Sequence, residues 1–373
     1  MKLTVGQSLL GDALIQATRA LPQSPVHPVM AGVRLRAADG ILEVSAFDYE
    51  SSAHGRVPGD VDAPGSAIVP GRLLAEIVRS MPGKFIELTA DGTRMTLTSG
   101  AATFTLMQLP AQDYPELPEL PPLAGTIGSH AFASAVGQVA IATGKDHILP
   151  ALTGVRTEID GEQLTLIATD RYRLAIRAMT WTPAQPGVQA AFLIPVRALT
   201  DVARLAATAA EVALHIDPGQ ASAGDAGIAG FEAGPWQATT RLLTGEYPQA
   251  RKLIPAEFAC TAEVPAADLI EAVKRVALVT DRNTPVRLAF SKGSVRLEAG
   301  TGDQAEAREE LDVTFDDPDF QIAFNPSYLA AGLTAVGADV ARIAMTTPEK
   351  PAVMTAGGDD RYLYLLMPIR SAG

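Results

Sequence analysis

The chain has 373 residues, a formal net charge of −12, and a composition that is 47% hydrophobic but only 5% aromatic. Its length exceeds what one hydrophobic core ordinarily holds, and its composition excludes a disordered chain and predicts two or three globular domains with aliphatic cores. The acidic balance argues against a generic nucleic-acid coat, although a local basic surface stays compatible with it.

The start of the chain and its cysteine bear on where the protein resides. Gln7 and Asp12 interrupt any signal-like apolar core, so we expect the first twenty residues to belong to the mature protein. No stretch approaches the roughly 18 apolar residues of a membrane span. The one cysteine, Cys260, excludes an intramolecular disulfide and is more simply a small buried hydrophobic residue than a reactive thiol. We therefore expect a cytoplasmic protein with no membrane partner.

In chain order, the sequence predicts one series of elements three times. Apolar periodicity predicts helices near residues 10–21, 132–142 and 270–277. Each is followed by a strand pair with a glycine turn, over 31–50, 153–172 and 285–300, and the second pair begins 122 residues after the first. A second helix follows over 69–81, 194–206 and 325–337, where Pro70, Pro195 and Pro326 hold the position of a helix-initiating proline.

Two proline-rich segments, 108–125 and 244–255, separate the repeats. Each contains a tyrosine followed by proline, Tyr114-Pro115 and Tyr247-Pro248, which suggests equivalent linkers. We place domains at 1–122, 123–253 and 254–373. Helix, strands, helix and strands in each domain predict an α+β fold with antiparallel sheets.

The sequence contains no recognisable catalytic, cofactor-binding or metal-binding motif. The five histidines are isolated, and no nucleophile elbow, dinucleotide fingerprint, phosphate-binding loop or Cys-x-x-Cys pair is present. We therefore expect no catalytic residue, metal site or cofactor, and a binding or structural role. An enzyme without a recognisable motif is the alternative.

Positive charge recurs on the second helix of two repeats. The positions 125 residues apart are Arg72 and Arg197, Glu76 and Asp201, and Arg79 and Arg204. Their spacing puts each set on one helix face, where local arginine–carboxylate pairs would contribute about 0.2–0.5 kcal/mol each. The other interpretation is that these faces meet a phosphate backbone without reading bases. Further basic residues that could extend such a surface are Lys145, Lys274, Arg275 and Arg282.

Three tandem α+β repeats with the segments ATDRYRLA (168–175), GEYPQARKLIP (245–255) and YLYLLMPIR (362–370) resemble the bacterial sliding clamps, the beta subunits of DNA polymerase III. The resemblance covers the whole chain. It implies three clamp domains whose helices line a ring and whose sheets lie outside, in a head-to-tail homodimer around duplex DNA of any sequence. It also implies a non-catalytic processivity subunit.

The resemblance implies a pocket between the second and third domains for a short partner peptide with a glutamine and a Leu-Phe-like end. Its apolar part would be Leu152, Leu174, Pro248, Leu253, Leu366, Met367 and Pro368. Its rim would be Thr169, Arg171, Tyr172, Arg173, Lys252, Asn325, Tyr328 and Arg370. Locally, Met367, Pro368 and Ile369 fit a core-facing last strand as well as an adaptable groove.

The peptide-bearing partners implied are the alpha subunit of DNA polymerase III, the clamp loader, other polymerases and repair proteins, with peptide antibiotics as further ligands. The dimer seam would join Phe104 and Leu106 to Leu278 and Val279. Three residues depart from the family pattern, in which arginine is common at Ser24 and Lys252 and leucine at Ser371. We expect these three differences to alter the binding of DNA, of partner peptides or of inhibitors.

Two further functions stay open. An additional clamp copy would replace the main one when an inhibitor occupies the pocket. A repeat-built enzyme or carbohydrate-type binding protein would need a concave site with convergent acid–base residues, and the sequence suggests none.

Overall fold

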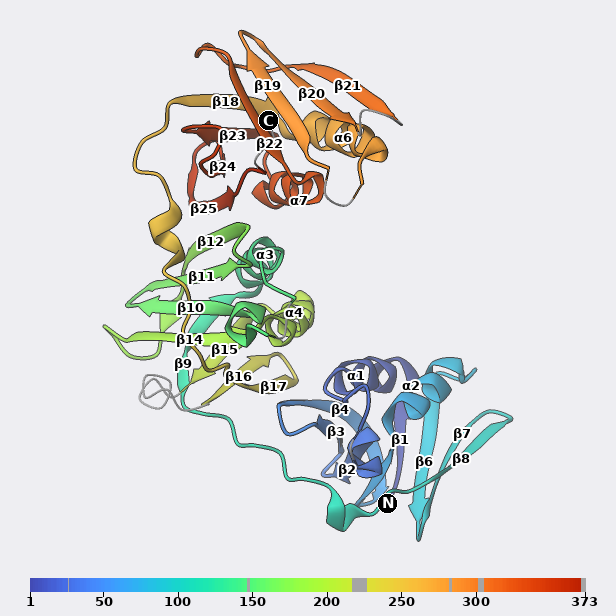
Figure 1. Cartoon of the computed structure of the whole chain (residues 1–373). Helices are drawn as coiled ribbons and strands as arrows, with labels where there is room; N and C mark the ends of the chain where they lie inside the picture. The colour runs from blue at the N-terminus through green and yellow to red at the C-terminus, as the bar shows by residue number, and fades with distance from the viewer. Residues whose placement is uncertain (26, 146–147, 217–226, 282–283, 301–304, 370–373) are drawn as a thin grey trace. The chain divides into compact units, whose positions relative to one another are not determined.

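The computed structural model describes residues 1–25, 27–145, 148–216, 227–281, 284–300 and 305–369. Contacts divide the chain into two units. Figure 1 colours the chain by residue number, from blue at the N-terminus to red at the C-terminus. Unit 1 comprises residues 1–133, 181–186 and 197–242, and unit 2 comprises residues 134–180, 187–196 and 243–373. Each unit combines helices with antiparallel sheets, which confirms the predicted α+β class.

Unit 1 is built on one 13-stranded sheet. Its main path runs β13-β9-β15-β16-β17-β4-β1-β6-β7-β8, and β3, β2 and β5 branch from β4. The strands are β1 (Lys2–Gly6), β2 (Gly32–Ala38), β3 (Ile41–Phe47), β4 (Ser51–Ala63), β5 (Gly65–Pro70), β6 (Phe85–Asp91), β7 (Arg94–Ser99), β8 (Ala102–Met107), β9 (Leu123–Gly128), β13 (Thr182–Pro183), β15 (Glu211–Ile216), β16 (Ile228–Ala233) and β17 (Trp236–Arg241).

Two helices of unit 1, α1 (Gln7–Arg19) and α2 (Gly71–Ser80), lie side by side in Figure 1. Their apolar stripes, Leu10 and Leu14 on α1 and Leu74 and Val78 on α2, are fully buried in one core with the strands. Burial of each leucine contributes about 1.5–3 kcal/mol, so these stripes fix which helix faces stay polar. Helix α4 (Val196–Leu205) belongs to unit 1 from Arg197 onward.

Unit 2 contains two sheets. The eight-stranded sheet has the order β14-β10-β11-β12-β25-β24-β23-β18, and the four-stranded sheet has the order β21-β20-β19-β22. The strands are β10 (Gly154–Asp160), β11 (Gln163–Thr169), β12 (Arg173–Thr180), β14 (Gln189–Pro195), β18 (Cys260–Pro265), β19 (Val286–Ser291), β20 (Ser294–Gly300), β21 (Glu306–Asp312), β22 (Phe320–Phe324), β23 (Val340–Met345), β24 (Ala352–Ala356) and β25 (Asp359–Leu366). Helices α6 (Ala266–Val276) and α7 (Pro326–Val336) pack together, and α3 (Ser129–Ala140) enters unit 2 at Ser134.

The predicted repeat is visible element by element. Strands β2 and β3 recur 122 residues later as β10 and β11, and α2 recurs 125 residues later as α4. Strand β11 recurs 131 residues later as β20. The central repeat contributes β9, β13 and β15 to β17 to unit 1 and β10 to β12 and β14 to unit 2, so packing and sequence repetition divide the chain differently.

Two of the three prolines at the second helices lie one residue before the predicted position. Pro326 is the first residue of α7, but Pro70 is the N-cap of α2 and the last residue of β5. Pro195 likewise ends β14 directly before α4. The strand runs into the helix without a loop, so the proline serves as the junction.

The two tyrosine–proline segments are anchored in the same way. The Tyr114 hydroxyl donates to the carbonyls of Gly32 and Ser45, and the Tyr247 hydroxyl donates to the carbonyl of Ile167, which lies 122 residues after Ser45. Burial raises the pKa of Tyr114 to about 12, so the hydroxyl stays a donor. Both segments are therefore pinned to equivalent strands.

Candidate functional site

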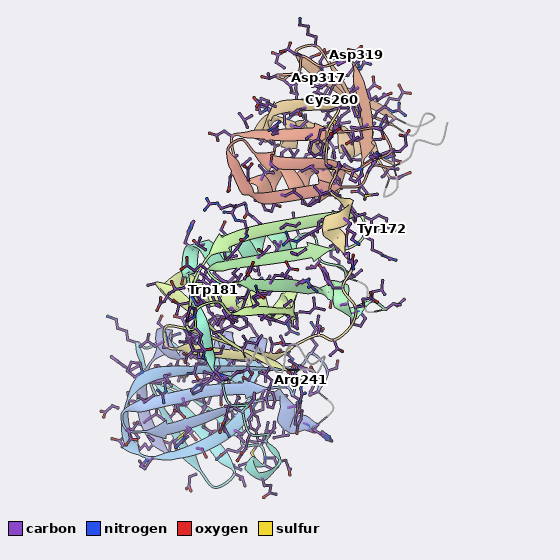
Figure 2. All side chains as sticks on the ribbon, turned by 90° about the vertical axis from the view of Figure 1, so that its left-hand side faces the viewer. Tyr172, Trp181, Arg241, Cys260, Asp317 and Asp319 are labelled. Atoms are coloured by element: carbon purple, nitrogen blue, oxygen red, sulfur yellow. The ribbon has the colours of Figure 1, made fainter. Side chains whose placement is uncertain are left out.

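The turn between β11 and β12 is held by its own side chains. Asp170 accepts hydrogen bonds from the backbone amides of Tyr172 and Arg173, both at 3.0 Å. Thr169 Oγ1 donates to the Arg173 carbonyl at 2.7 Å. Arg171 has a φ of +78°, a left-handed conformation that is uncommon for a residue with a side chain. This turn exposes Arg171 and leaves Tyr172 58% accessible, at the position labelled in Figure 2.

The first repeat forms the same turn with different side chains. Asp48 accepts from the amides of Glu50 and Ser51, and Tyr49 has a φ of +70°. Asp48 lies 122 residues before Asp170. The aspartate turn therefore belongs to the repeat, whereas the Arg171-Tyr172-Arg173 fork is specific to the central one.

Arg173 is held by an ion pair and by a stacked aromatic ring. Its Nε lies 2.9 Å from Asp170 Oδ2, and its guanidinium carbon lies 4.1 Å from the centroid of the Tyr328 ring. Burial opposes its charge, but Tyr364 and Asp170 keep the pKa of Arg173 above its ordinary value. The Tyr364 hydroxyl donates to the Tyr328 carbonyl at 2.9 Å, so the stacked ring is itself supported.

The start of α7 fixes the direction of Tyr328. Asn325 caps this helix, because its Oδ1 accepts from the amides of Ser327 and Tyr328 at 3.0 and 3.2 Å. The cap sets the first helical turn, from which the Tyr328 ring reaches Arg173. Asn325 thus contributes through the position of Tyr328.

An apolar cluster lies beside this polar wall. Three of the predicted residues belong to it, namely Leu152 and Leu174, which are buried, and Met367, which is partly buried. The other members are Ala151, Ile167, Ile176, Leu193, Leu243, Tyr247, Ala250, Ile254, Val353, Leu363 and Leu365. Sequence reasoning missed most of these, although Tyr247 lay within a segment it singled out.

Strand pairing brings the end of the chain to the fork. Arg173 in β12 is opposite Leu366 in β25, and the Met367 amide donates to the Tyr172 carbonyl at 2.8 Å. Side chains alternate along β25, so Leu365 joins the apolar cluster and Leu366 points to the other face of the sheet. The predicted Leu366 is therefore fully buried outside the cluster, and Leu365 takes the place expected for it.

A cavity of about 340 Å³ opens at this wall. The residues that line it are Thr143, Gly144, Lys145, Leu149, Leu152, Asp170, Arg171, Tyr172, Arg173 and Tyr328. Lys145, expected with the DNA-facing set, thus lies at this cavity. Leu149 is exposed at this cavity and stands next to a proline in the sequence. That position was the available signal for an apolar rim, and sequence reasoning did not use it.

The remaining predicted pocket residues lie near the wall or apart from it. Pro248, Lys252 and Leu253 are exposed on the segment that contributes Tyr247 and Ala250 to the cluster. Pro368 is partly buried after Met367. Ile369 lines a different cavity, and its amide donates to the Ala323 carbonyl. Arg370 and Ser371 lie outside the described residues.

The predicted basic residues of unit 1 behave differently on α2 and α4. Arg72 Nη2 donates to the carbonyls of Leu21 and Pro22, just past the end of α1, instead of pairing with Glu76. Arg79 is exposed and makes no ion pair with any residue that the structure describes. Arg197 and Arg204 both pair with Asp201 and have side chains 61% and 60% exposed. Ser24 is exposed.

In unit 2, the basic residues of α6 are engaged by acids. Lys274 Nζ lies 2.7 Å from Glu271, and Arg275 Nε donates to Glu309 of β21 at 3.0 Å. Arg282 falls outside the described residues.

Two of the predicted seam residues lie on an edge strand, and the other two lie in a segment that contacts an edge strand. Phe104 and Leu106 belong to β8, which ends the described path of the unit 1 sheet, and Phe104 is 38% exposed. Leu278, 85% exposed, and the half-buried Val279 follow α6. Strand β21, which contacts the segment of these two residues, ends the four-stranded sheet.

Metal sites and membrane spans are two further features to consider in the part of the chain that the structure describes. No group of three or more His, Cys, Asp or Glu side chains there is arranged to hold a metal ion. No helix there is long and apolar enough to cross a membrane.

Comparisons with known proteins match this architecture over nearly the whole chain. Family models of the DNA polymerase III beta subunit match at its N-terminal domain over residues 1–118, its central domain over 126–249 and its C-terminal domain over 251–370. The beta sliding clamp of Streptomyces coelicolor is 44% identical, with all of both chains covered.

Two further relatives are informative. The beta sliding clamp homolog GriR of Streptomyces muensis is 36% identical, with 99% of each chain covered. A crystal structure of the Pseudomonas aeruginosa sliding clamp bound to griselimycin superposes with a TM-score of 0.91 at 25% identity, again with 99% of each chain covered.

Proposed function

The chain belongs to the DNA polymerase III beta subunit family, the bacterial sliding clamps, and from this premise we propose that two copies close head-to-tail into a ring around duplex DNA. It is a processivity factor and not an enzyme. A ring that encircles the duplex raises the effective concentration of a tethered polymerase at the primer end.

The observation that best supports binding of a partner peptide is that three segments distant in the sequence meet at one wall of the pocket. Arg173, the first residue of β12, stacks on Tyr328 in the first turn of α7. Met367, directly after β25, donates its amide to the carbonyl of the neighbouring Tyr172. An apolar cluster beside exposed arginine and tyrosine side chains suits an extended peptide with a Leu-Phe-like end. We assign the predicted pocket residues to this role, with Lys145, Leu149 and Leu365 added and Leu366 as support.

The partners proposed for the pocket are the polymerase alpha subunit, the clamp loader, and other polymerases and repair proteins that carry such peptides. Peptide antibiotics join them, because the Pseudomonas aeruginosa clamp was solved with griselimycin bound. We place these events in the cytoplasm, where bacterial DNA is replicated.

The proposed domains are 1–122, 123–253 and 254–373. The three family-model matches support them, since the gaps between the matches fall at 119–125 and 250. The hydrogen bonds of Tyr114 and Tyr247 support equivalent linkers between domains.

Two sheet edges support the head-to-tail dimer. A heterologous contact joins unlike surfaces and closes into a ring when its rotation permits. Strands β8 and β21 each have one free edge among the described sheets, and the exposed apolar side chains of Phe104 and Leu278 lie near them. Covering these edges would satisfy their backbone groups and remove the apolar side chains from water.

Duplex binding is assigned to Arg72, Arg79, Arg197 and Arg204, with Lys274, Arg275 and Arg282 as further candidates. The exposed guanidinium groups on α2 and α4 support this role for the first four. Phosphate contacts of this kind are independent of sequence and weaken with salt, as sliding requires.

The main replicative clamp is favoured over an additional copy. The chain is 44% identical to the Streptomyces coelicolor clamp and 36% identical to the clamp homolog GriR.

A truncation separates the pocket from the dimer. Removal of residues from Met367 onward should abolish binding of a labelled peptide with a glutamine and a Leu-Phe end. Native mass spectrometry should still give twice the mass of the truncated chain. Retained peptide binding would refute the pocket assignment, and a monomeric mass would refute the separate seam.

A further inference from the structure

Three arginines converge on one carboxylate in unit 1. Asp201 Oδ1 lies 2.7 Å from Arg204 Nη1 and 3.0 Å from Arg19 Nη1. Asp201 Oδ2 lies 4.0 Å from Arg197 Nε. Arg19, the last residue of α1, is 182 positions away in the sequence and was not among the predicted basic residues. Asp201 therefore joins two helices through a shared ion pair.

The cluster keeps a net positive charge and unused donors. Three guanidinium groups and one carboxylate leave a charge of +2. Arg197 Nη2 donates to the Arg19 carbonyl at 2.6 Å, which holds its side chain beside the carboxylate. A guanidinium has five N–H donors, so Arg197 and Arg204 retain several for an incoming anion. Asp201 itself is 24% exposed and lies within the cluster.

The repeat-equivalent helix has no such arrangement. Glu76 of α2 occupies the position 125 residues before Asp201 and is exposed. Among the described residues it forms no ion pair, because Arg72 turns to the carbonyls of Leu21 and Pro22. The chain thus presents two basic helices, only one of which carries an internal counter-ion.

We propose that Asp201 is a tuning residue that keeps the phosphate contacts of Arg197 and Arg204 weak. The inference rests on the proposed function. The Asp201 carboxylate already engages Arg204 Nη1 and lies 4.0 Å from Arg197 Nε, so a phosphate oxygen that approaches either arginine shares that guanidinium with Asp201 and reaches only its remaining N–H donors. It also meets a negative charge within a few ångströms, where repulsion is less screened than between distant surface charges. Asp201 thereby limits duplex affinity and permits movement along DNA.

Asp201→Asn and Glu76→Gln provide a matched comparison, since each removes one negative charge from an equivalent helix position. Affinity of the full-length clamp for a short duplex is measured over 50–200 mM salt. We expect Asp201→Asn to raise affinity several-fold above Glu76→Gln and to steepen the slope of log affinity against log salt by about 0.9 for each additional phosphate that the protein neutralises. One-dimensional diffusion on stretched DNA should slow only in Asp201→Asn.

Two outcomes would overturn the proposal, and one control background tests its basis. Equal gains in the two variants would mean a general charge effect and would overturn the proposal. A loss of affinity in Asp201→Asn would show that the carboxylate instead holds the arginines in a productive position, which also overturns it. In a background with Arg197→Ala and Arg204→Ala, the extra effect of Asp201→Asn should vanish, because the two guanidinium groups that Asp201 shares with the phosphate are gone.

Separate measurements report the folding of the variants and the proposed clamp function. Thermal unfolding of each variant reports whether the Arg19 link is needed for stability, and Asp201→Ser repeats the comparison if the asparagine variant unfolds below the assay temperature. A wild-type chain that is not retained on circular DNA would overturn both the proposed function and this inference. A retained wild type with no difference between the two variants would overturn this inference alone.

Discussion

The guanidinium carbon of Arg173 lies 4.1 Å from the centroid of the Tyr328 ring, which ties strand β12 to helix α7. This stacking, the ion pair with Asp170 and the cap by Asn325 give the candidate pocket one rigid wall. A preformed wall lowers the entropy cost of ordering side chains when a peptide binds.

Arg173→Ala should weaken binding of a labelled clamp-binding peptide by about tenfold or more. The stacking contact contributes about 0.5–2 kcal/mol, and its loss also leaves Asp170 without its partner. Arg173→Lys should be intermediate, because it keeps the charge but loses the planar group. Fluorescence anisotropy measures both.

Ser51→Ala is the control for Arg173, since it changes the position 122 residues earlier in the first repeat. It should leave peptide affinity unchanged. Equal affinity in the wild type and Arg173→Ala would remove this residue from the pocket.

Gly332→Ala should destabilise the protein and weaken peptide binding. A Cβ at Gly332 would lie 2.2 Å from Tyr364 Cε1, so the tyrosine that supports Tyr328 would have to move. Overpacking of this kind costs about 1–3 kcal/mol. Urea unfolding and the peptide titration report the two effects.

Gly137→Ala is matched to this change because Gly137 lies in α3 at a position where an added Cβ would meet open space. It should stabilise slightly, by up to about 1 kcal/mol, through helix propensity. Similar losses of stability in the two variants would contradict the close approach of Tyr364.

Cys260 should resist thiol reagents in the folded protein. The side chain is 5% exposed, and burial, with a smaller contribution from Asp317, raises its pKa to about 11. Figure 2 labels both residues in unit 2. At pH 8 the native thiol should react far more slowly than the denatured one, because little thiolate is present and access is blocked. Rapid stoichiometric labelling of the native protein would refute this burial.

Asp359 should make stability fall in acid. Hydrogen bonds from Arg177 and Arg361 lower the pKa of Asp359 to about 2 from its ordinary 3.8. A lowered folded-state pKa stabilises the protein above about pH 4, and this contribution disappears as the pH falls through 2. Asp359→Asn should therefore lose on the order of 1 kcal/mol at pH 7 and flatten the acid limb of the stability curve.

The neighbouring Asp360 offers the comparison for this acid effect. It is exposed and forms no ion pair with another described residue. Asp360→Asn should leave urea midpoints at pH 7 and pH 3 unchanged. A steeper acid loss in Asp359→Asn than in the wild type would contradict the lowered pKa.

The sequence predicted the features that local pattern encodes. The repeats and the α+β class follow from glycine turns, alternation and apolar periodicity. The hydrogen bonds of the turn between β11 and β12 are also local, because the short side chain of Asp170 reaches the amides of the next residues. Asp48 makes the same kind of hydrogen bond in the first repeat.

Contacts between distant segments were harder to predict. The pairing of β12 with β25 decides that Leu365, and not Leu366, faces the apolar cluster, and a one-residue change of register would exchange them. Asp201 pairs with Arg197 and Arg204 along its own helix, as one of the two interpretations expected, but Arg19 also reaches it from a segment 182 residues away. Lys145 was grouped by charge alone, whereas packing places it at the cavity beside Tyr172.

Release from cut DNA tests the central proposal most directly. The clamp is loaded onto a nicked circular plasmid by a clamp loader, freed of unbound protein by gel filtration, and then exposed to a restriction enzyme that linearises the circle. A ring that encircles the duplex should stay with the circle and leave after the cut, because only topology retains it. A chain that stays equally on circular and linear DNA, or that binds neither, would contradict its role as a sliding clamp.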